Sequence, residues 1–472
     1  MVFSSLMFLF VFFPVILAGY YLIDKRYKNY FLLLASLVFY AFGEPVYVLL
    51  MIFSIGVNYG FGLLVSGGSS RSIQKLYVAL SLVFNIGLLG VFKYTGFIMT
   101  NINSLFDVDI SYPVLQLPLG ISFFTFQALS YVIDVYRNDA KVQRNFFNLA
   151  LYISLFPQLV AGPIVRYQTV ADQMENRSHT VEKFSEGVRR FVQGMGKKIL
   201  IANPLGAVGD GVFAIPGDEI SMATSWVGVI AYSLQIYFDF SGYSDMAIGL
   251  GKMFGFDFLE NFNYPYISQS VSEFWRRWHI SLGSWFREYV YIPLGGNRVG
   301  PVRVYFNLFV VWMLTGFWHG AAWNFVAWGL YFGILIALEK AFLGRVLKKV
   351  YRPFRHAYLI LAVIFGWVFF RAESFSYGID YIKSMIGLGS GGVYDNLTYV
   401  YLHDYGYLFI IGIILSTPII KVIMEKIQSS RPALVDNHLF YGLTSCGYTL
   451  MFLVIVVKLV NSTYNPFLYF RF

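Results

Sequence analysis

Residues 315–323 have the sequence Thr-Gly-Phe-Trp-His-Gly-Ala-Ala-Trp, and they join two apolar runs, 304–317 and 321–338. The joint places His319 between two stretches that could be buried in lipid. Ionisable residues inside a membrane are costly and are functional candidates by default. The alternative is an imidazole that is only hydrogen-bonded in a core. We favour a functional His319, because glycines flank the Phe-Trp-His run and no charged residue lies near it.

The composition of the whole chain also indicates a membrane protein. Of its 472 residues, 57% are hydrophobic and 13% are charged, whereas average soluble domains carry about 25% charged residues. A soluble chain of this composition could not cover its surface with polar groups, so most of it must face lipid or other spans. The sequence therefore predicts an all-α, polytopic membrane protein.

Together with the two runs that meet near His319, the apolar runs of the chain predict about eleven spans. Several are short, and we expect some to be tilted or re-entrant. The candidate spans are residues 4–22, 30–42, 47–65, 77–99, 146–165, 223–250, 304–317, 321–338, 358–370, 407–423 and 439–460.

The distribution of basic residues predicts the orientation of the chain. Lys25, Arg26 and Lys28 follow the first span, whereas residues 101–113 contain no Lys or Arg. Because cytoplasmic loops are enriched in Lys and Arg, this alternation predicts an extracytoplasmic N-terminus. The last span then delivers an aromatic tail, residues 461–472, to the same side. Residues 1–20 lack the features of a cleaved signal peptide, and we expect a retained first span.

Two further segments are too polar to cross lipid alone. Residues 182–198 alternate apolar and basic side chains at helical spacing, which predicts an amphipathic helix on the inner leaflet. Residues 261–294 are rich in Trp and Arg, and we expect helices that lie along the membrane or dip into it. No linker or short repeat interrupts the chain, so we expect one domain over residues 1–472.

A second histidine and a polar cluster extend the candidate site. His279 lies in Phe-Trp-Arg-Arg-Trp-His-Ile-Ser-Leu, residues 274–282, where functional and surface roles are equally favoured. The cluster interrupts an apolar run and could line a cavity, although a polar network that holds helices together is favoured slightly. Its members are Asp239, Ser241, Tyr243, Ser244 and Asp245.

Other classes of site are weakly supported. The single cysteine, Cys446, excludes disulfides and Cys-ligated zinc. The sequence contains no phosphate-binding loop of the G-x-x-x-x-G-K-[ST] type and no G-x-S-x-G nucleophile motif. The six histidines are scattered, so we expect no metal. The net charge of +9 is concentrated in short loops, which argues against nucleic-acid binding.

The motifs together resemble the membrane-bound O-acyltransferase (MBOAT) superfamily, and most of all its bacterial branch typified by the alginate O-acetyltransferase membrane subunit. The resemblance also extends upstream, through residues 118–127 and 160–164, so that it covers most of the chain. The matching stretches are YFDFSGYSDMAIGLG (237–251), ENFNYPY (260–266), FWRRWHISL (274–282), YIPLGGNR (291–298) and TGFWHGAAW (315–323).

The resemblance implies a helical bundle around a central tunnel, with His319 as the catalytic histidine and His279 as the second signature position. Acetyl-CoA would enter from the cytoplasm as acyl donor, and the acceptor would approach from outside. No permanently bound cofactor is implied. The other candidate tunnel residues are Asn261, Trp278 and Trp318, together with the polar cluster.

The C-terminal residues Pro-Phe-Leu-Tyr-Phe-Arg-Phe (466–472) resemble the F-x-Y-F ending of related acyl-export systems. There a tyrosine is thought to carry the acyl group, which makes Tyr469 a candidate carrier. A phenol is a far better leaving group than a sugar hydroxyl, so its ester stays activated. The alternative is an aromatic anchor at the membrane interface.

These inferences favour an O-acyltransferase of the bacterial cytoplasmic membrane that exports acetyl groups for O-acetylation of an extracytoplasmic polysaccharide. An extracytoplasmic, serine esterase-like transferase would complete the transfer. Acyl transfer to peptidoglycan or teichoic acid is the alternative within the class. From another class, a non-catalytic transporter or polymer-export component stays open, although the absence of paired half-repeats argues against it.

Overall fold

The computed structural model describes residues 1–113, 115–159, 162–432, 438–462, 464–466 and 468, and this part of the chain is helical without any β-strand. It contains two compact units. Unit 1 comprises Met1–Phe191 and Tyr243–Leu259, and unit 2 comprises Val192–Gly242 and the described residues from Glu260 onward. The expectation of one domain over residues 1–472 stays a prediction.

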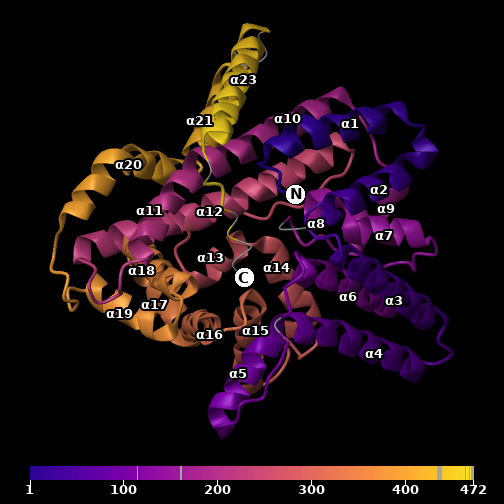
Figure 1. Cartoon of the computed structure of the whole chain (residues 1–472), viewed down its shortest axis with the longest axis horizontal. Coiled ribbons are helices and arrows are strands. Elements are labelled where there is room, and N and C mark those ends of the chain that lie inside the picture. Colours follow the sequence, from indigo (N-terminus) through magenta and orange to yellow (C-terminus); the bar gives the residue numbers. More distant parts are fainter. Residues whose placement is uncertain (114, 160–161, 433–437, 463, 467, 469–472) are drawn as a thin grey trace. The chain divides into compact units, whose positions relative to one another are not determined.

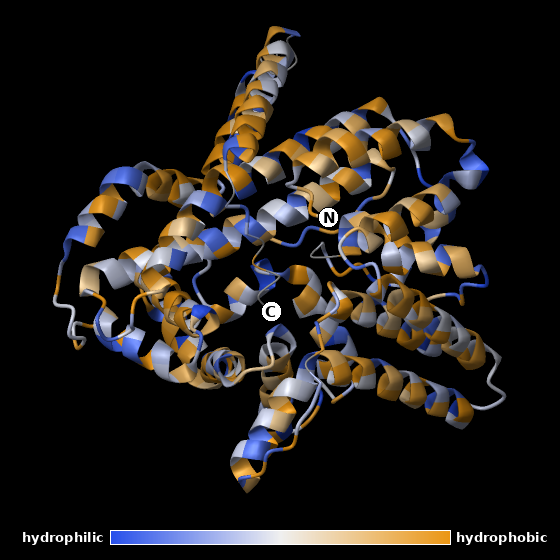
Figure 2. Ribbon diagram, in the orientation of Figure 1, coloured by the Kyte–Doolittle hydropathy of each residue, from blue (hydrophilic) through white to orange (hydrophobic). Residues whose placement is uncertain are grey.

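Six helices among the described residues are long and apolar enough to cross a membrane, and the protein is a multi-pass membrane protein. The ribbon coloured by hydropathy shows many hydrophobic residues along the helices (Figure 2). The six are Tyr47–Gly67, Arg71–Phe106, Trp323–Lys349, Arg352–Arg371, Asn396–Leu415 and His438–Asn461. The other predicted spans are helical only in shorter or more polar pieces, and the total of about eleven stays a prediction.

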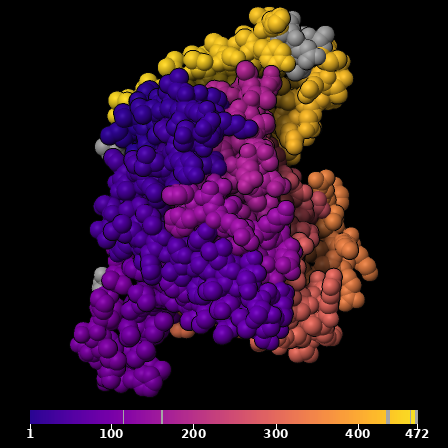
Figure 3. Space-filling model, turned by 90° about the vertical axis from the view of Figure 1, so that its right-hand side faces the viewer, coloured from indigo at the N-terminus to yellow at the C-terminus, as the bar shows by residue number. Residues whose placement is uncertain are grey.

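Unit 1 is built from the amino-terminal helices, which form one continuous face, coloured indigo to purple, in the space-filling view (Figure 3). A π-helical turn at Gly90–Tyr94 joins α4 to α5. The helices are α1 (Phe13–Leu22), α2 (Lys28–Ala41), α3 (Tyr47–Gly67), α4 (Arg71–Leu89), α5 (Thr95–Phe106), α6 (Ile121–Arg137), α7 (Phe146–Ser154), α8 (Phe156–Leu159), α9 (Tyr167–Glu175) and, up to Phe191, α10 (Val181–Gly196).

Helix α6 was not among the expected spans, although almost all of it is buried. It packs against α3 and α4 (Figure 1). Its sequence mixes Phe and Leu with buried polar residues, including Gln127 and Asp134. Apolarity alone does not detect such a helix, because its polar side chains are enclosed by protein and never meet lipid.

Two predicted spans, 146–165 and 407–423, are not continuous helices, and a proline explains each break. The run 146–165 ends its first helix at Ser154 and turns at Leu155 before α8. The run 407–423 is divided between α20 (Asn396–Leu415) and α21 (Ile419–Ser430). Pro157 and Pro418 cannot donate a backbone hydrogen bond, and their rings would clash with the carbonyl four residues earlier.

Unit 2 surrounds an aromatic core that includes Trp278, Trp328 and Trp367. Helix α12 (Met222–Met253) contributes its residues up to Gly242 to this unit. The others are α11 (Asn203–Phe213), α13 (Val271–Arg277), α14 (Ile280–Phe286), α15 (Pro301–His319), α16 (Trp323–Leu338), α17 (Gly344–Lys349), α18 (Arg352–Arg371), α19 (Phe375–Met385), α20, α21 and α23 (His438–Asn461).

The two polar segments are helical as expected. Residues 182–198 form α10 and the start of a π-helical turn, η4 (Lys197–Ala202), with Phe191, Val192 and Met195 buried. Residues 261–294 contain the short helices α13 and α14. The position of α10 on the inner leaflet stays a prediction.

Helices α15 and α16 approach each other closely enough for their backbones to touch. A Cβ atom added at Gly316 would lie 2.3 Å from the carbonyl oxygen of Phe325. A Cβ atom added at Gly329 would lie 2.4 Å from the carbonyl oxygen of Trp312. Only glycine allows this approach, which fixes the last turn of α15, and therefore His319, against α16.

We predict that Gly329→Ala lowers the free energy of unfolding by about 1–3 kcal/mol, because the new methyl group must push α15 and α16 apart. Thermal unfolding of the purified protein in detergent measures the change. The matched control is Gly442→Ala in α23, where an added Cβ atom meets nothing within 4 Å. Equal stability of both variants would contradict the close approach.

Candidate functional site

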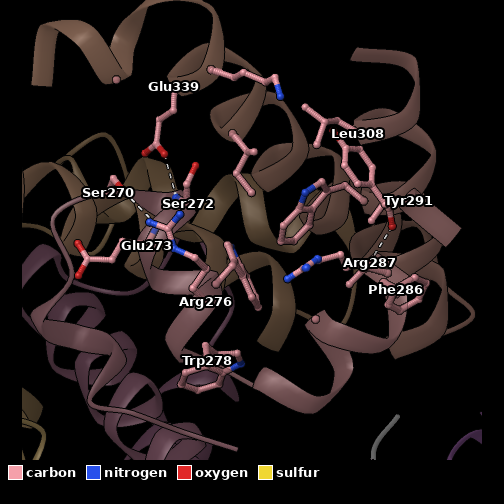
Figure 4. Close-up of a pocket in the computed structure, with 18 of the residues that line it drawn as sticks. Ser270, Ser272, Glu273, Arg276, Trp278, Phe286, Arg287, Tyr291, Leu308 and Glu339 are labelled. Carbon is pink, nitrogen blue, oxygen red and sulfur yellow. Dashed lines mark hydrogen bonds between the residues drawn. The ribbon is translucent and has the colours of Figure 1, made fainter. Parts of the chain in front are cut away.

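A cavity of about 950 Å³ opens in unit 2 between α13, α14, α15 and the segment from α16 to α17. This volume lies within the range of pockets that bind small molecules and cofactors, about 300–1,000 Å³. Figure 4 shows Arg276, Arg287, Glu273 and Glu339 around it. Trp278 and His279 also line it, so that one signature histidine borders the cavity.

The charge of the cavity wall is predominantly positive. Five Lys or Arg residues line it against two Glu residues. The Nε atom of Arg355 and the indole nitrogen of Trp275 are buried, and neither has a hydrogen-bond partner among the described residues. Buried donors are nearly always satisfied, so both are available to an anionic or polar ligand in the cavity. The charged lining residues are Glu273, Arg276, Arg287, Glu339, Lys340, Lys348 and Arg355.

His279 is held in an unusual backbone conformation at the start of α14. Its φ of 44° and ψ of 53° lie in the left-handed region, which costs a residue other than glycine about 1–3 kcal/mol. Its side chain is only 6% exposed. His279 lies outside the six spans, and burial lowers the pKa of its imidazole to about 3. The ring is therefore neutral at physiological pH, and it can donate an N–H without carrying charge.

Asn261 fixes the turn that carries His279. The side-chain oxygen of Asn261 accepts hydrogen bonds from the backbone N–H of Ser281 at 3.1 Å and from its hydroxyl at 2.9 Å. The backbone carbonyl of Asn261 accepts from the N–H of Ile280 at 2.9 Å. Asn261 is therefore a positioning residue for the histidine turn.

Glu339 fixes the other end of the same segment, and the sequence analysis missed it. Its carboxylate accepts the backbone N–H of Val271 at 2.6 Å and that of Ser272 at 2.9 Å. Both donors belong to the first turn of α13, where a carboxylate is favourable. The only feature of the sequence that could have indicated this role is the position of Glu339 directly after the apolar run 321–338.

Trp318 contacts both histidines. Its ring centroid is 6.2 Å from that of His279 and 5.0 Å from that of His319. His319 is the last residue of α15 and is partly buried. Its ring also packs edge-on against Trp328 at 5.0 Å and Phe370 at 5.2 Å. Both imidazoles thus contact the indole of Trp318. We call the rings of Trp318, Trp328 and Phe370 around His319 the aromatic enclosure.

A second, smaller cavity of about 390 Å³ lies beside the same enclosure. Phe370, which packs against His319, lines it together with Asn324, Arg371 and Glu373. Neither Phe370 nor the other lining residues belong to the first cavity. The first cavity therefore borders His279, whereas the second borders Phe370, which contacts His319.

The polar cluster of α12 is divided between the two units, and none of its members lines either cavity. In unit 2, Asp239 is buried and ion-paired to Lys198 at 2.7 Å, and Ser241 is buried nearby in sequence. In unit 1, the Asp245 carboxylate pairs with Arg190 at 2.7 Å. Tyr243 stacks on Phe3 at 4.7 Å, and Ser244 is buried. Their predicted tunnel role stays a prediction.

Tyr469 lies outside the described residues. Among those described, no three His, Cys, Asp or Glu side chains converge as a metal site. His319, His279, Trp278 and Trp318 are the predicted residues that the structure gathers, and Asn261 supports them through Ser281.

Comparison with known proteins identifies the relatives of this chain. Residues 137–378 match the model of the MBOAT, membrane-bound O-acyltransferase family. The chain is 45% identical to the probable alginate O-acetylase AlgI of Pseudomonas aeruginosa over 396 residues, which cover 83% of this chain and 76% of the relative. It is 40% identical to the probable alginate O-acetylase AlgI of Azotobacter vinelandii over the full length of both chains.

A third relative carries a different name. The peptidoglycan O-acetyltransferase of Helicobacter pylori is 37% identical over 423 residues, 82% of this chain and 80% of the relative. The family match covers both signature histidines and the whole aromatic enclosure around Trp318. On these grounds the chain belongs to the membrane-bound O-acyltransferase family and is an O-acyltransferase.

Proposed function

We propose that this enzyme transfers acetyl groups from cytoplasmic acetyl-CoA across a bacterial cytoplasmic membrane for the O-acetylation of an alginate-like exopolysaccharide. The observation that carries the proposal is the contact of Trp318 with both His279 and His319, with a basic cavity bordered by His279 and a second cavity beside Phe370. Such a constellation can hold a donor and an acceptor on opposite sides of one reaction centre.

The first cavity suits the donor. The phosphates of acetyl-CoA need cations and N–H donors, and Arg355 offers a buried Nε without a partner in the described part of the chain. Lys340 and Lys348 also line this cavity. Because Lys and Arg are enriched on the cytoplasmic side of membrane proteins, they favour a cavity that opens toward the cytoplasm. The thioester end would then reach His279 and Trp278, which line the same cavity.

The chemistry assigns different roles to the two histidines. A neutral His319 takes the proton from the acceptor hydroxyl as its oxygen attacks the thioester carbonyl. His279, which is neutral because of its burial, donates an N–H toward the carbonyl oxygen as negative charge develops there. The C–S bond then breaks, the new ester forms, and the proton held by His319 passes to the CoA thiolate.

The acceptor in this proposal is Tyr469, whose phenolic ester keeps the acetyl group activated after CoA has left. The charge of the loops supports extracytoplasmic N- and C-termini, and a serine esterase-like partner outside the membrane would move the group onto the polymer. The names of the Pseudomonas and Azotobacter relatives favour an alginate-like polymer. The name of the Helicobacter relative makes peptidoglycan the second candidate.

We predict that His319→Ala reduces polymer O-acetylation by about 10³-fold, because the loss of a general base costs about 10²–10⁴-fold in rate. The measurement is the acetyl content of the extracytoplasmic polymer, with the amount of enzyme in the membrane quantified in parallel. His403→Ala, at an exposed histidine that pairs with Asp404, is the control and should leave acetylation unchanged. Full acetylation in the His319 variant would end the assignment.

We also predict that Arg355→Gln raises the KM for acetyl-CoA about tenfold with little change in kcat, because a charge-assisted bond to the donor is lost before the chemical step. Release of CoA by the purified enzyme measures both constants. Arg352→Gln is the matched control, since Arg352 lies on the same helix and does not line the cavity. With acetyl-pantetheine, which lacks the nucleotide phosphates, the Arg355 variant and the wild type should have equal KM. An unchanged KM for acetyl-CoA would place the donor elsewhere.

A further inference from the structure

The described part of the C-terminal tail is fixed to unit 2 by its main chain. Helix α23 ends at Asn461, and the tail that follows contacts η4, α11 and α12 of the same unit. Leu468 is only 1% exposed. A tail that served only as an interfacial anchor would not need these enclosed polar contacts.

The central contact is a buried ion pair. Lys198 Nζ lies 2.7 Å from an Asp239 carboxylate oxygen, and the two side chains are 3% and 2% exposed. Each side chain of the pair also forms a hydrogen bond with the tail. Lys198 donates to the carbonyl of Pro466, and Asp239 accepts the backbone N–H of Leu468 at 3.1 Å.

A second set of contacts holds the tail a few residues earlier. The Tyr464 hydroxyl donates to one oxygen of Asp210 at 2.7 Å, and Arg371 occupies the other oxygen at 2.8 Å. The side chain of Asn203 donates to that of Asn465 at 3.2 Å. Arg371 also lines the second cavity, beside the Phe370 ring that contacts His319.

Burial explains why these contacts determine position. An enclosed ion pair is stable only if its remaining donors and acceptors are satisfied. Here backbone groups of the tail add a hydrogen bond to each partner of the pair, and the side-chain contacts of Tyr464 with Asp210 and of Asn465 with Asn203 set the register. The ion pair thus holds the backbone of the tail, and the side chains of Tyr464 and Asn465 select its place along the chain.

We propose that Lys198, Asp239 and Asp210 form a receptor for the chain's own C-terminal segment, which we name the tail seat, and that they are positioning residues for acyl transfer to the tail. The tail seat holds Tyr464, Pro466 and Leu468, and Tyr469 follows Leu468 directly in the sequence. The proposal rests on the proposed function through the carrier role of Tyr469.

The first experiment measures seating without acyl transfer. In a Cys446→Ser background, Asn203→Cys with Asn465→Cys places two thiols where side chains now form a hydrogen bond, and oxidation of the purified protein should yield a disulfide detected by mass spectrometry. Adding Lys198→Met with Asp239→Leu removes both partners of the tail without leaving a lone buried charge. We expect the disulfide yield to fall about fivefold, because the tail is no longer held.

A control pair separates loss of seating from loss of folding. Thr224 and Thr398, whose hydroxyls are 2.6 Å apart, lie in the same unit away from the tail. Thr224→Cys with Thr398→Cys should form its disulfide in both backgrounds. An undiminished 203–465 disulfide in the Lys198→Met, Asp239→Leu background would overturn the tail seat.

The second experiment uses a variant that carries little risk of misfolding. Tyr464→Phe removes one hydroxyl, while Asp210 keeps its ion pair with Arg371. After incubation with labelled acetyl-CoA, we expect about tenfold less acetyl on the C-terminal peptide, because a hydrogen bond to a charged group is lost, with an unchanged KM for acetyl-CoA. The control is Tyr448→Phe, which removes an exposed hydrogen bond from Gln193. Equal labelling of the Tyr464 and Tyr448 variants would contradict the proposal.

Tyr469→Phe distinguishes this proposal from the proposed function. If the tail seat and the carrier role of Tyr469 are both correct, the Tyr469→Phe variant loses polymer acetylation and keeps the 203–465 disulfide. If the variant keeps acetylation while the disulfide still depends on Lys198 and Asp239, the carrier role fails, and with it the positioning role in transfer, whereas the tail seat itself stands.

Discussion

The contact between the backbones of α15 and α16 is the constraint on which the candidate site depends. Gly316 and Gly329 let the two helices meet without intervening side chains. The end of α15 is therefore held against the aromatic face of α16, where the His319 ring packs on Trp328. A wider spacing between the two helices would move the imidazole of His319 away from Trp328. The position of the catalytic candidate therefore depends on two glycines.

The position of His279 depends on a different structural feature. The short helices α13 and α14 meet at a turn whose geometry requires His279 in a left-handed conformation. Glu339 holds the beginning of α13, and Asn261 holds the beginning of α14. Backbone strain at a residue fixed from both sides is typical of sites where position matters more than stability. One histidine thus ends a rigid helix and the other lies in a strained turn, and Trp318 contacts both.

Local sequence patterns predicted the parts of this structure that depend on neighbours in the chain. The apolar runs predicted α16, α18 and α23, and the helical spacing of residues 182–198 predicted α10. The pattern failed where proline breaks an apolar run, as at Pro157 and Pro418, and where a buried helix carries polar residues, as in α6. At the prolines, the backbone determines where the helix ends. In α6, the surrounding protein determines that polar side chains can be buried.

In the candidate site too, some residues could be predicted from neighbouring residues in the sequence, whereas others could not. His319 could be selected from its motif, because an imidazole between apolar and aromatic residues is costly without a purpose. For His279 the pattern left functional and surface roles equally favoured, and the resemblance to the family selected it. Glu339, Arg355 and the pair of Lys198 with Asp239 could not be selected from the sequence, since their roles depend on contacts between residues far apart in the sequence, such as that of Asp239 with Leu468. The enzyme class follows from the motifs, whereas the arrangement that supports the reaction follows only from the fold.

The central claim is that the donor thioester meets the acceptor beside Trp318, between the two imidazoles. The most direct measurement is an electron cryomicroscopy structure in lipid nanodiscs with a stable thioether analogue of acetyl-CoA. The account predicts the nucleotide phosphates near Arg355 and the acyl end beside His279 and Trp318, with the His319 ring facing it. An analogue bound outside the cavity, or a His319 ring turned toward lipid, would contradict the account.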